Sequence, residues 1–210
     1  MAYCNWGHSS ALNLKYHDEE WGVPVYDDIK QFEFLMMEVM QCGLNWNMMI
    51  NKREIFRRCF DDFDFDKIAA YTDDDAKRIM NTAGMIKSPR KISAIINNAV
   101  CFQRICREFG SFCDYLWAHT DGKTVIYDRH PDGYIPVSNG LSDNIAKDLK
   151  KRGFKYLGSI TVYSHLQACG IICDHDKNCP RRQYIIDNFP TVQKRRFKEK
   201  GVKCFNSDIV

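Results

Sequence analysis

Apolar side chains recur at intervals of three and four residues along most of the chain, which is the spacing of one face of an α-helix. The clearest case begins at Asp28 and ends before Gly43, a residue type that commonly follows a helix. Its apolar stripe consists of Phe32, Leu35, Met36, Val39 and Met40. The same spacing predicts further helices over residues 45–59, 65–71, 73–83, 89–109, 111–117, 142–152 and 160–172.

Polar residues at the helix boundaries support this prediction. Asp64, Thr72 and Ser111 each precede a predicted helix, where a side-chain oxygen can accept a hydrogen bond from a free backbone N–H group. Ser88-Pro89 is typical of a helix start, because proline fits the first helical position. Gly84 is expected to end the preceding helix, so the chain should form a hairpin of two helices near residues 83–92.

Two regions lack the helical pattern. Residues 119–137 are rich in Gly, Pro and Asp and predict a loop, with room for a short hairpin. After Pro190 the chain becomes basic and loses its periodicity, so residues 190–210 are expected to be a flexible tail. The pattern therefore predicts an all-α protein with a single folded unit over residues 1–189.

Composition excludes several classes of protein. No apolar run reaches the roughly 18 residues that a membrane span requires. The first residues lack the basic and apolar segments of a secretion signal, so the ten cysteines are expected to be free thiols. These features predict a cytoplasmic protein without membrane contact, and we expect it to act as a monomer.

The net charge of +3 is unevenly distributed. Residues 181–210 contain eight Lys and Arg residues against three acidic ones, which gives +5 and leaves −2 for the remainder. A slightly acidic body does not by itself predict nucleic-acid binding. Any DNA contact must come from local basic clusters or from backbone N–H groups.

Four residues near the two ends of the chain have the chemistry of a metal site. Cys4 and His17 lie near the N-terminus, and His175 and Cys179 form a pair with three residues between them. Two cysteines and two histidines are a common tetrahedral ligand set for structural zinc. The spacing alone leaves open that these are scattered core thiols and surface imidazoles, and Cys173 is a rival ligand.

The predicted hairpin is a candidate phosphate-binding element. Its second helix opens with free N–H groups, and Lys87, Arg90 and Lys91 add local positive charge. An ordinary helix connection with solvated lysines is the alternative. A second basic stretch over residues 147–155 could face a DNA backbone, with a solvated helix face as the equal alternative.

Glu38 is a candidate pocket residue, because it falls within the apolar helix that begins at Asp28. A buried carboxylate without a partner is costly, and such groups often serve function. Trp46 follows eight residues later and Tyr16 precedes His17, so aromatic faces could join the carboxylate in binding a flat cation. An exposed glutamate and a core tryptophan remain the alternatives.

Taken in order, these residues closely resemble the type I DNA-3-methyladenine glycosylases. The resemblance covers about residues 1–182 in several separate motifs. The matching segments are Cys4-x-Trp6, Tyr16-His17-Asp18-x-x-Trp21-Gly22-x-Pro24, Glu38, Gly43-Leu44-x-Trp46, Lys52-x-Glu54, Gly84-x-Ile86, Lys91-Ile92, Leu149-Lys150-Lys151-Arg152-Gly153-Phe154-Lys155 and His175-x3-Cys179-Pro180.

The resemblance implies a helix-hairpin-helix glycosylase fold that excises 3-methyladenine from double-stranded DNA containing alkylated bases. It implies one structural Zn²⁺ held by Cys4, His17, His175 and Cys179, which joins the N- and C-terminal segments. Glu38 is the implied catalytic residue; with Tyr16 it hydrogen-bonds the adenine edge, while Trp46 stacks on the base and Trp6 lies nearby. The implied DNA-binding hairpin residues are Gly84, Ile86, Lys87, Arg90 and Lys91.

The chain departs from the common residues of that family at Asn13, Asn45, Ser159 and His165. We expect His165 to be a buried histidine with satisfied hydrogen bonds. A non-catalytic lesion-binding protein on the same fold is the main alternative function. A zinc hydrolase is disfavoured, because four protein ligands leave no open coordination position for water.

Overall fold

The computed structural model describes residues 4–127 and 135–194. Its α-helices are α1 (Ala11–Glu19), α2 (Asp28–Gln41), α3 (Trp46–Cys59), α4 (Phe65–Ala69), α5 (Asp73–Asn81), α6 (Pro89–Phe109), α7 (Phe112–Ala118), α8 (Gly140–Lys151), α9 (Ser159–Ala168) and α10 (Pro180–Asn188). Two short 3-10 helices, η1 (Asn5–Ser9) and η2 (Asp61–Phe63), and two strands, β1 (Thr124–Tyr127) and β2 (Thr191–Lys194), complete the described elements.

The predicted helices between Asp28 and Ala168 are confirmed, with boundaries shifted by a few residues. The side chain of Asp64 accepts from the backbone N–H groups of Asp66 and Lys67 at the start of α4. Ser111 caps α7 in the same way. Ser88 precedes Pro89 as predicted, but its side chain makes no capping hydrogen bond. The sequence pattern did not reveal α1 or α10.

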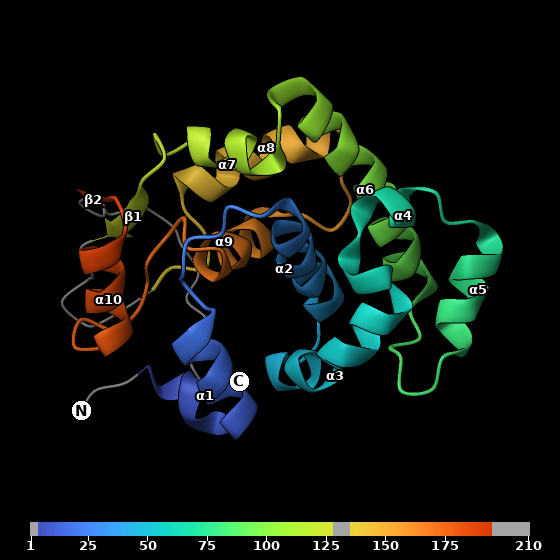
Figure 1. Cartoon of the computed structure of the whole chain (residues 1–210), viewed down its shortest axis with the longest axis horizontal. Helices are drawn as coiled ribbons and strands as arrows, with labels where there is room; N and C mark the ends of the chain where they lie inside the picture. The colour runs from blue at the N-terminus through green and yellow to red at the C-terminus, as the bar shows by residue number, and fades with distance from the viewer. Residues whose placement is uncertain (1–3, 128–134, 195–210) are drawn as a thin grey trace.

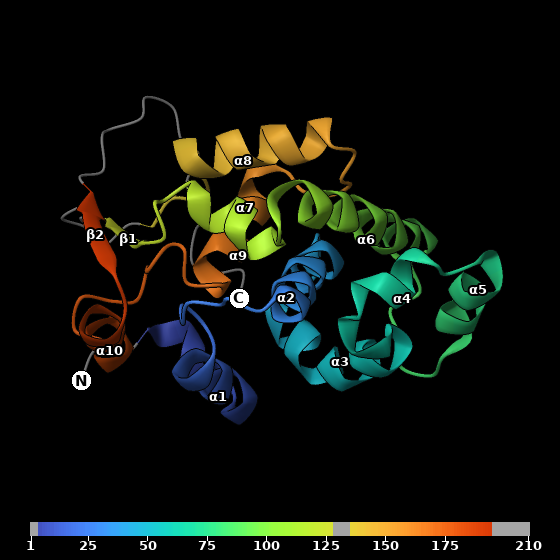
Figure 2. The same cartoon turned by 45° about the horizontal axis from the view of Figure 1, so that its top comes forward.

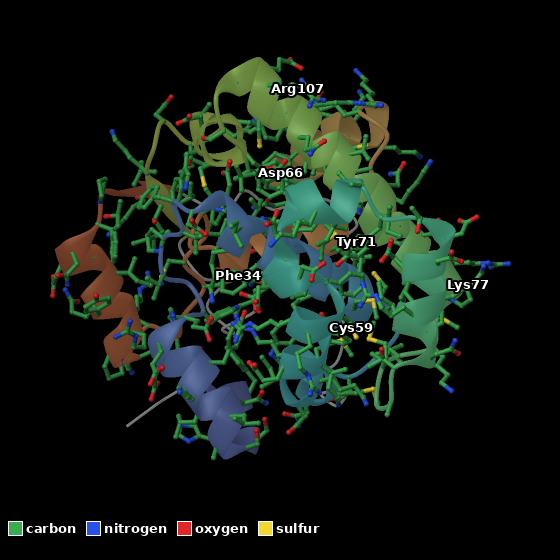
Figure 3. All side chains as sticks on the ribbon, turned by 45° about the vertical axis from the view of Figure 1, so that its right-hand side comes forward. Phe34, Cys59, Asp66, Tyr71, Lys77 and Arg107 are labelled. Carbon is green, nitrogen blue, oxygen red and sulfur yellow. The ribbon has the colours of Figure 1, made fainter. Side chains whose placement is uncertain are left out.

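Helix α2 is the centre of the molecule (Figure 1). It packs against α3, α6, α7 and α9, and every residue from Gln31 to Met40 is buried. The long helix α6 is crossed by α4, while Lys77 of α5 projects outward and Phe34 of α2 lies in the interior (Figure 3). A helix surrounded in this way imposes an apolar environment on any polar side chain that it carries.

The protein is mostly helical, as predicted, but residues 191–194 of the predicted flexible tail form a strand, and so does part of the predicted loop. Strand β1 lies in the predicted loop, and it pairs in parallel with β2, with Val125 opposite Val192. A parallel pair cannot be a hairpin, so the two strands necessarily come from distant parts of the chain. Residues 195–210 of the predicted tail lie outside the described residues.

The strands and α10 lie at the opposite end of the molecule from α5 (Figure 2). Ile126 of β1, Cys173 and Ile185 of α10 form a small apolar cluster there. No helix in residues 4–127 and 135–194 is long and apolar enough to cross a lipid bilayer.

Charged side chains fasten α3 to the central helix. The guanidinium of Arg53 donates two hydrogen bonds to Glu20, each at 2.8 Å, and a third to Glu33 of α2 at 2.8 Å. Arg57 and Lys30 also contact Glu33. The guanidinium of Arg53 also lies 5.6 Å from the centre of the Phe34 ring. This network, which the sequence did not predict, satisfies a buried carboxylate and fixes the position of α1 relative to α2 and α3.

The segment after α1 crosses the segment after α9 at van der Waals distance. The N–H groups of Gly22 and Val25 donate to the carbonyl oxygens of Ala168 and Cys169. Gly170 has a φ of +77°, and a Cβ atom there would lie 2.4 Å from the backbone nitrogen of Pro24. The positive φ ends α9 at Ala168, four residues before the predicted end, and the missing side chain permits the crossing.

We predict that Gly170→Ala strongly destabilises the protein, because both the backbone conformation and the contact with Pro24 exclude a methyl group. The free energy of unfolding, measured by urea denaturation, should fall by about 3 kcal/mol or more. Gly122→Ala is the matched control, since Gly122 has a φ of +70° but no atom within 4 Å of its Cβ position. It should lose only about 1 kcal/mol, and equal losses in the two variants would contradict the role of the crossing.

Candidate active site and metal centre

Helix α2 carries two buried glutamates in opposite electrostatic environments. Glu33 contacts Lys30, Arg53 and Arg57, and these cations lower the pKa of its carboxyl group to about 2 despite its burial. The side chain of Glu38 has no hydrogen bond or ion pair within the described residues, and it is 6% exposed. Burial raises the pKa of Glu38 to about 8, so its carboxyl group is largely protonated at neutral pH.

Aromatic side chains gather around Tyr16, which interacts electrostatically with this carboxyl group. Tyr16 of α1 is buried, and burial together with the nearby Glu38 raises the pKa of its hydroxyl group well above the usual value. The ring of Trp46 lies 5.3 Å from that of Tyr16 between centroids, and Trp6 lies 6.3 Å from Tyr16 on another side. The four predicted pocket residues therefore lie in one region of the structure. Glu38 is buried, which excludes the alternative of an exposed glutamate.

Two buried polar side chains from different helices, Arg53 of α3 and Asn13 of α1, favour this arrangement. Arg53 lies 6.0 Å from the centre of the Tyr16 ring. Asn13, one turn before Tyr16 in α1, is fully buried and donates a hydrogen bond to Asn47 of α3. Both contacts connect α1 to α3 on either side of Tyr16. The sequence signal for Arg53 was a charge within the apolar stripe of α3, which also contains Met49, Ile50 and Phe56.

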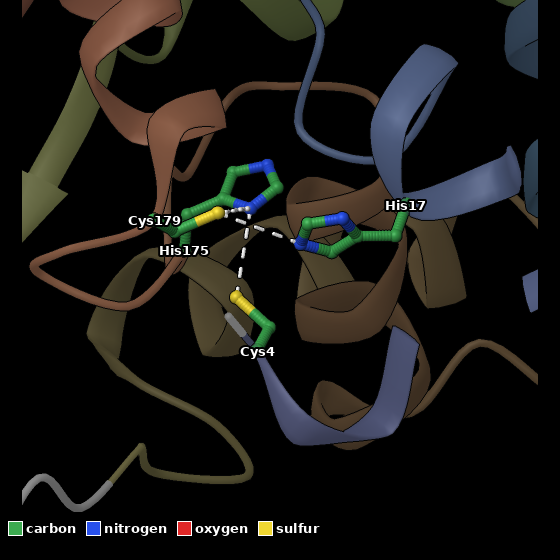
Figure 4. Close-up of side chains that lie close together, drawn as sticks. All are labelled: Cys4, His17, His175 and Cys179. Atoms are coloured by element: carbon green, nitrogen blue, oxygen red, sulfur yellow. Dashed lines mark hydrogen bonds between the residues drawn. The ribbon is translucent and has the colours of Figure 1, made fainter. Parts of the chain in front are cut away.

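Cys4, His17, His175 and Cys179 converge beside this site (Figure 4). All four are buried, and their ligand atoms lie within 4.8 Å of one another. The Cys179 sulfur lies 3.6 Å from His17 Nε2 and 3.6 Å from His175 Nδ1, and the Cys4 sulfur lies 3.7 Å from His175 Nδ1. An ideal tetrahedral zinc site has sulfur–nitrogen edges of about 3.5 Å. The residues therefore fit a tetrahedral metal ion.

The surroundings of these four residues also fit a metal. His17 directs its other nitrogen, Nδ1, to Asp18 at 2.7 Å, and His175 directs Nε2 to the carbonyl oxygen of Trp21 at 3.0 Å. Such contacts orient ligating histidines. The rival ligand Cys173 is outside the group, because its thiol lies in the apolar cluster with Ile126 and Ile185.

Helices α5 and α6 form the predicted hairpin. Gly84 is exposed, with a φ of +79°, and its carbonyl oxygen accepts a hydrogen bond from Lys52 of α3 at 2.5 Å. Lys87 and Arg90 are exposed, and Ile86 is half-buried. Lys52 therefore ties the turn to α3, the helix that begins at Trp46.

Lys91 differs from its expected role at a DNA surface. Its ammonium group is buried and donates to the carbonyl oxygens of Met40, at 2.6 Å, and Cys42, at 2.7 Å. These are the last carbonyl groups of α2, where a cation is favourable. Lys91 therefore fixes the end of α2 that leads to Gly43 and Trp46, and its cation is not offered to a phosphate.

A groove of about 580 Å³ lies between the start of α6 and the loop that precedes α9. Its lining contains two cations and no acidic residue: Pro89, Arg90, Ser93, Ala94, Asn97, Lys155 and Tyr156. Asn98 holds the loop by bonding both backbone groups of Lys155, at 2.8 and 3.0 Å. Tyr156 has a φ of +60°, which is rare for a residue with a side chain. The loop is therefore held rigidly against α6.

Residues 6–183 match the family model described as methyladenine glycosylase. The chain belongs to the methyladenine glycosylase family. It is 39% identical over 179 residues to the DNA-3-methyladenine glycosylase 1 of Escherichia coli K12, and the match covers 85% of this chain and 96% of that protein.

Two solved glycosylase structures show the same fold. One is the Y16F variant of 3-methyladenine DNA glycosylase I in complex with 3-methyladenine, with a TM-score of 0.82 and 34% identity. The other is the E38Q variant of the enzyme from Staphylococcus aureus, with a TM-score of 0.81 and 34% identity. Each comparison covers 87% of this chain and 98% of the other. Strand β2 and the residues after it lie beyond the segment that the family model matches.

Proposed function

We propose that this glycosylase excises 3-methyladenine from DNA by hydrolysing the N-glycosidic bond and leaving an abasic site. The single observation that carries the proposal is the buried, unpaired carboxyl group of Glu38 beside Tyr16 and Trp46. The related enzymes studied as Y16F and E38Q variants carry changes at the same two residue numbers, and the Y16F variant was solved with 3-methyladenine. These relatives support the assignment of the pocket.

The chemistry of the substrate explains why so few groups are required. A base within a duplex must leave the stack before an enzyme can act on it. N3-methylation makes the adenine of the nucleotide cationic, so the base departs as a neutral molecule without prior protonation. The pocket has to bind the flipped base, exclude normal adenine and admit a water molecule to the sugar carbon.

Glu38 has the electrostatic properties that would select such a base. Its carboxyl group loses its proton reluctantly in the empty pocket, because ionisation there is uncompensated. A cationic base supplies the missing countercharge, which favours the carboxylate and so couples ionisation to substrate binding. Normal adenine is neutral and provides no such compensation. Tyr16 would hydrogen-bond the base edge, and Trp46 would stack on its face.

The groove between α6 and the Lys155 loop would hold one DNA strand beside the pocket. Arg90 and Lys155 offer positive charge without an opposing acid in the lining, which suits a phosphate backbone. The exposed hairpin residues Gly84 and Lys87, with half-buried Ile86, extend this surface toward α5. We do not assign Lys91 to it, since its ammonium group is bonded to the end of α2.

Cys4, His17, His175 and Cys179 would hold one structural Zn²⁺. When bound, the ion would supply a closed cross-link between the two ends of the folded chain, with no open position for catalysis. Tyr16 immediately precedes the metal ligand His17 in the sequence, so holding His17 also holds the backbone of Tyr16. The metal would thereby stabilise the position of Tyr16 without contacting the base.

A non-catalytic lesion-binding protein is the alternative function. It requires a pocket that recognises the cationic base but does not allow hydrolysis. Because the leaving group is already activated, binding the flipped base and admitting water are nearly sufficient for excision, so the complete pocket favours an enzyme.

We predict that the purified protein releases 3-methyladenine from methylated DNA, as identified by chromatography of the free bases. Glu38→Gln should lower kcat/KM about tenfold or more, because the amide cannot provide the negative charge that the cationic base favours. Glu19→Gln is the control, since Glu19 is exposed on α1, and its ion pair with Lys15 is a surface contact at 4.0 Å. Absence of any released base from the parent protein would support the binding-only alternative.

The same substitution has an opposite expected effect on stability, which separates lost activity from misfolding. The pKa of Glu38 rises from 4.5 to about 8 on folding, so the parent protein loses stability as the pH rises from about 4.5 to 8. The Gln variant lacks this titration. Relative to the parent, its free energy of unfolding should therefore increase by about 2 kcal/mol or more between pH 4.5 and pH 8.5.

We predict that the double variant Arg90→Gln/Lys155→Gln binds undamaged duplex DNA more weakly. The slope of log K against log salt concentration, measured by fluorescence anisotropy, should decrease in magnitude by about 2, because two phosphate contacts are lost. Lys123→Gln/Lys194→Gln is the matched control, since these exposed lysines lie at the strands, far from α5. A greater loss of binding in the control variant would instead place the DNA at the end of the molecule that carries β1 and β2.

We predict about one zinc ion per chain by elemental analysis of protein purified without chelators. Cys179→Ser should lose most of the metal and melt at a lower temperature, because the cross-link between distant segments is broken. Cys173→Ser is the control, as this buried thiol lies outside the ligand group. It should retain the metal, and a parent protein without zinc would contradict the proposed cofactor.

A further inference from the structure

Helices α2 and α9 pack in opposite directions, and two contacts define their register. At one end the Cys42 sulfur lies 3.7 Å from the Thr161 hydroxyl oxygen. At the other end the side chain of Gln31 lies beside the Cys169 thiol. Residue numbers along α2 therefore decrease in the direction in which those along α9 increase. Helical spacing then gives the facing residues, which are 42, 38, 35 and 31 on α2 and 161, 165 and 168–169 on α9.

This register places His165 opposite Glu38. Each residue is one helical turn from the contact between Cys42 and Thr161, along its own helix. Tyr16 lies at the same junction, since both Glu38 and Cys169 are among the groups that raise the pKa of its hydroxyl. Polar groups from α1, α2 and α9 thus lie in the same part of the core.

His165 has unused hydrogen-bonding capacity. It is 1% exposed, and neither ring nitrogen has a partner within the part of the chain that the structure describes. The prediction of a satisfied buried histidine is therefore wrong. Burial lowers the pKa of His165 to about 3, so the imidazole is neutral and carries one N–H donor and one acceptor. Unpaired polar atoms in a core are rare because they cost stability.

We propose that His165 contacts the base during excision and forms a hydrogen bond to its edge, on the side of the pocket across from α2. This inference rests on the proposed base pocket and adds a third hydrogen-bonding residue to Glu38 and Tyr16. A neutral imidazole suits a cationic base, because it supplies donor and acceptor atoms without like-charge repulsion. The bound base would in turn satisfy a ring nitrogen that lacks a partner in the empty protein.

The test measures binding of free 3-methyladenine to the full chain by tryptophan fluorescence. His165→Phe keeps the ring but removes both nitrogens, and its dissociation constant should rise about fivefold. His165→Gln keeps a donor and an acceptor and should recover part of the affinity. His119→Phe is the matched control, because the His119 ring packs against Tyr115, outside the junction of α1, α2 and α9.

A spectroscopic readout separates base contact from a structural role. The imidazole ¹⁵N resonances of His165 should shift on addition of 3-methyladenine, while those of His119 should not. His165→Phe should unfold at the same temperature as the parent or a higher one, since it removes unpaired buried atoms. Unchanged ¹⁵N shifts, or a Phe variant that binds as tightly as the parent, would overturn the proposal.

The outcomes for His165 and for the enzyme as a whole are distinguishable. If the parent chain neither binds nor releases 3-methyladenine, the proposed function fails. If the parent binds and releases the base while His165→Phe does both equally well, only the role of His165 fails. A Gln variant as weak as the Phe variant would also count against a hydrogen bond from this position.

Discussion

The burial of α2 is the constraint on which the rest of the structure depends. Ten consecutive residues of this helix are removed from water, so each polar group among them must find a partner or change its protonation state. Glu33 has a partner in Arg53, whereas Glu38 has a raised pKa and keeps its proton. The same helix therefore supplies both a structural ion-pair network and a carboxyl group held near its point of ionisation, and the difference lies only in the neighbouring helices.

Positioning Tyr16 against Glu38 depends on connections that are distant in the sequence. Arg53 and Glu20 fix the end of α1 on one side. On the other side, the backbone crossing at Gly170 and the cluster of Cys4, His17, His175 and Cys179 join the first residues of the chain to the last helices. A short helix such as α1 has little stability of its own. Its geometry is consequently set by these attachments, which lie outside the pocket.

The sequence predicted what depends on local patterns and missed what depends on long-range pairing. Helical periodicity and caps such as Asp64 gave most helices between residues 28 and 168, because their signals lie within a few residues. Strand β1 was not predicted because its partner is more than sixty residues away. Its four residues favour a strand, but so short a run does not distinguish a strand from a loop. Glu38, Tyr16 and Trp46 were pocket candidates by residue type, and the family resemblance supplied their roles and added Trp6. Their burial, and the engagement of Lys91 by the end of α2, required the packed structure.

The proposed pocket differs from the rest of the core in how its polar side chains are satisfied. Wherever a buried charge serves the fold alone, as with Glu33 and Arg53, it has several partners at hydrogen-bond distance. By the register of α2 and α9, Glu38 and His165 lie on facing sides of the two helices. Glu38 is buried and ionises reluctantly, and the ring nitrogens of His165 have no partner in the described residues. Leaving both groups unpaired weakens the fold, and an apolar pair would pack there at no such cost. Their presence is explained if the missing partner is a ligand that enters only during the reaction.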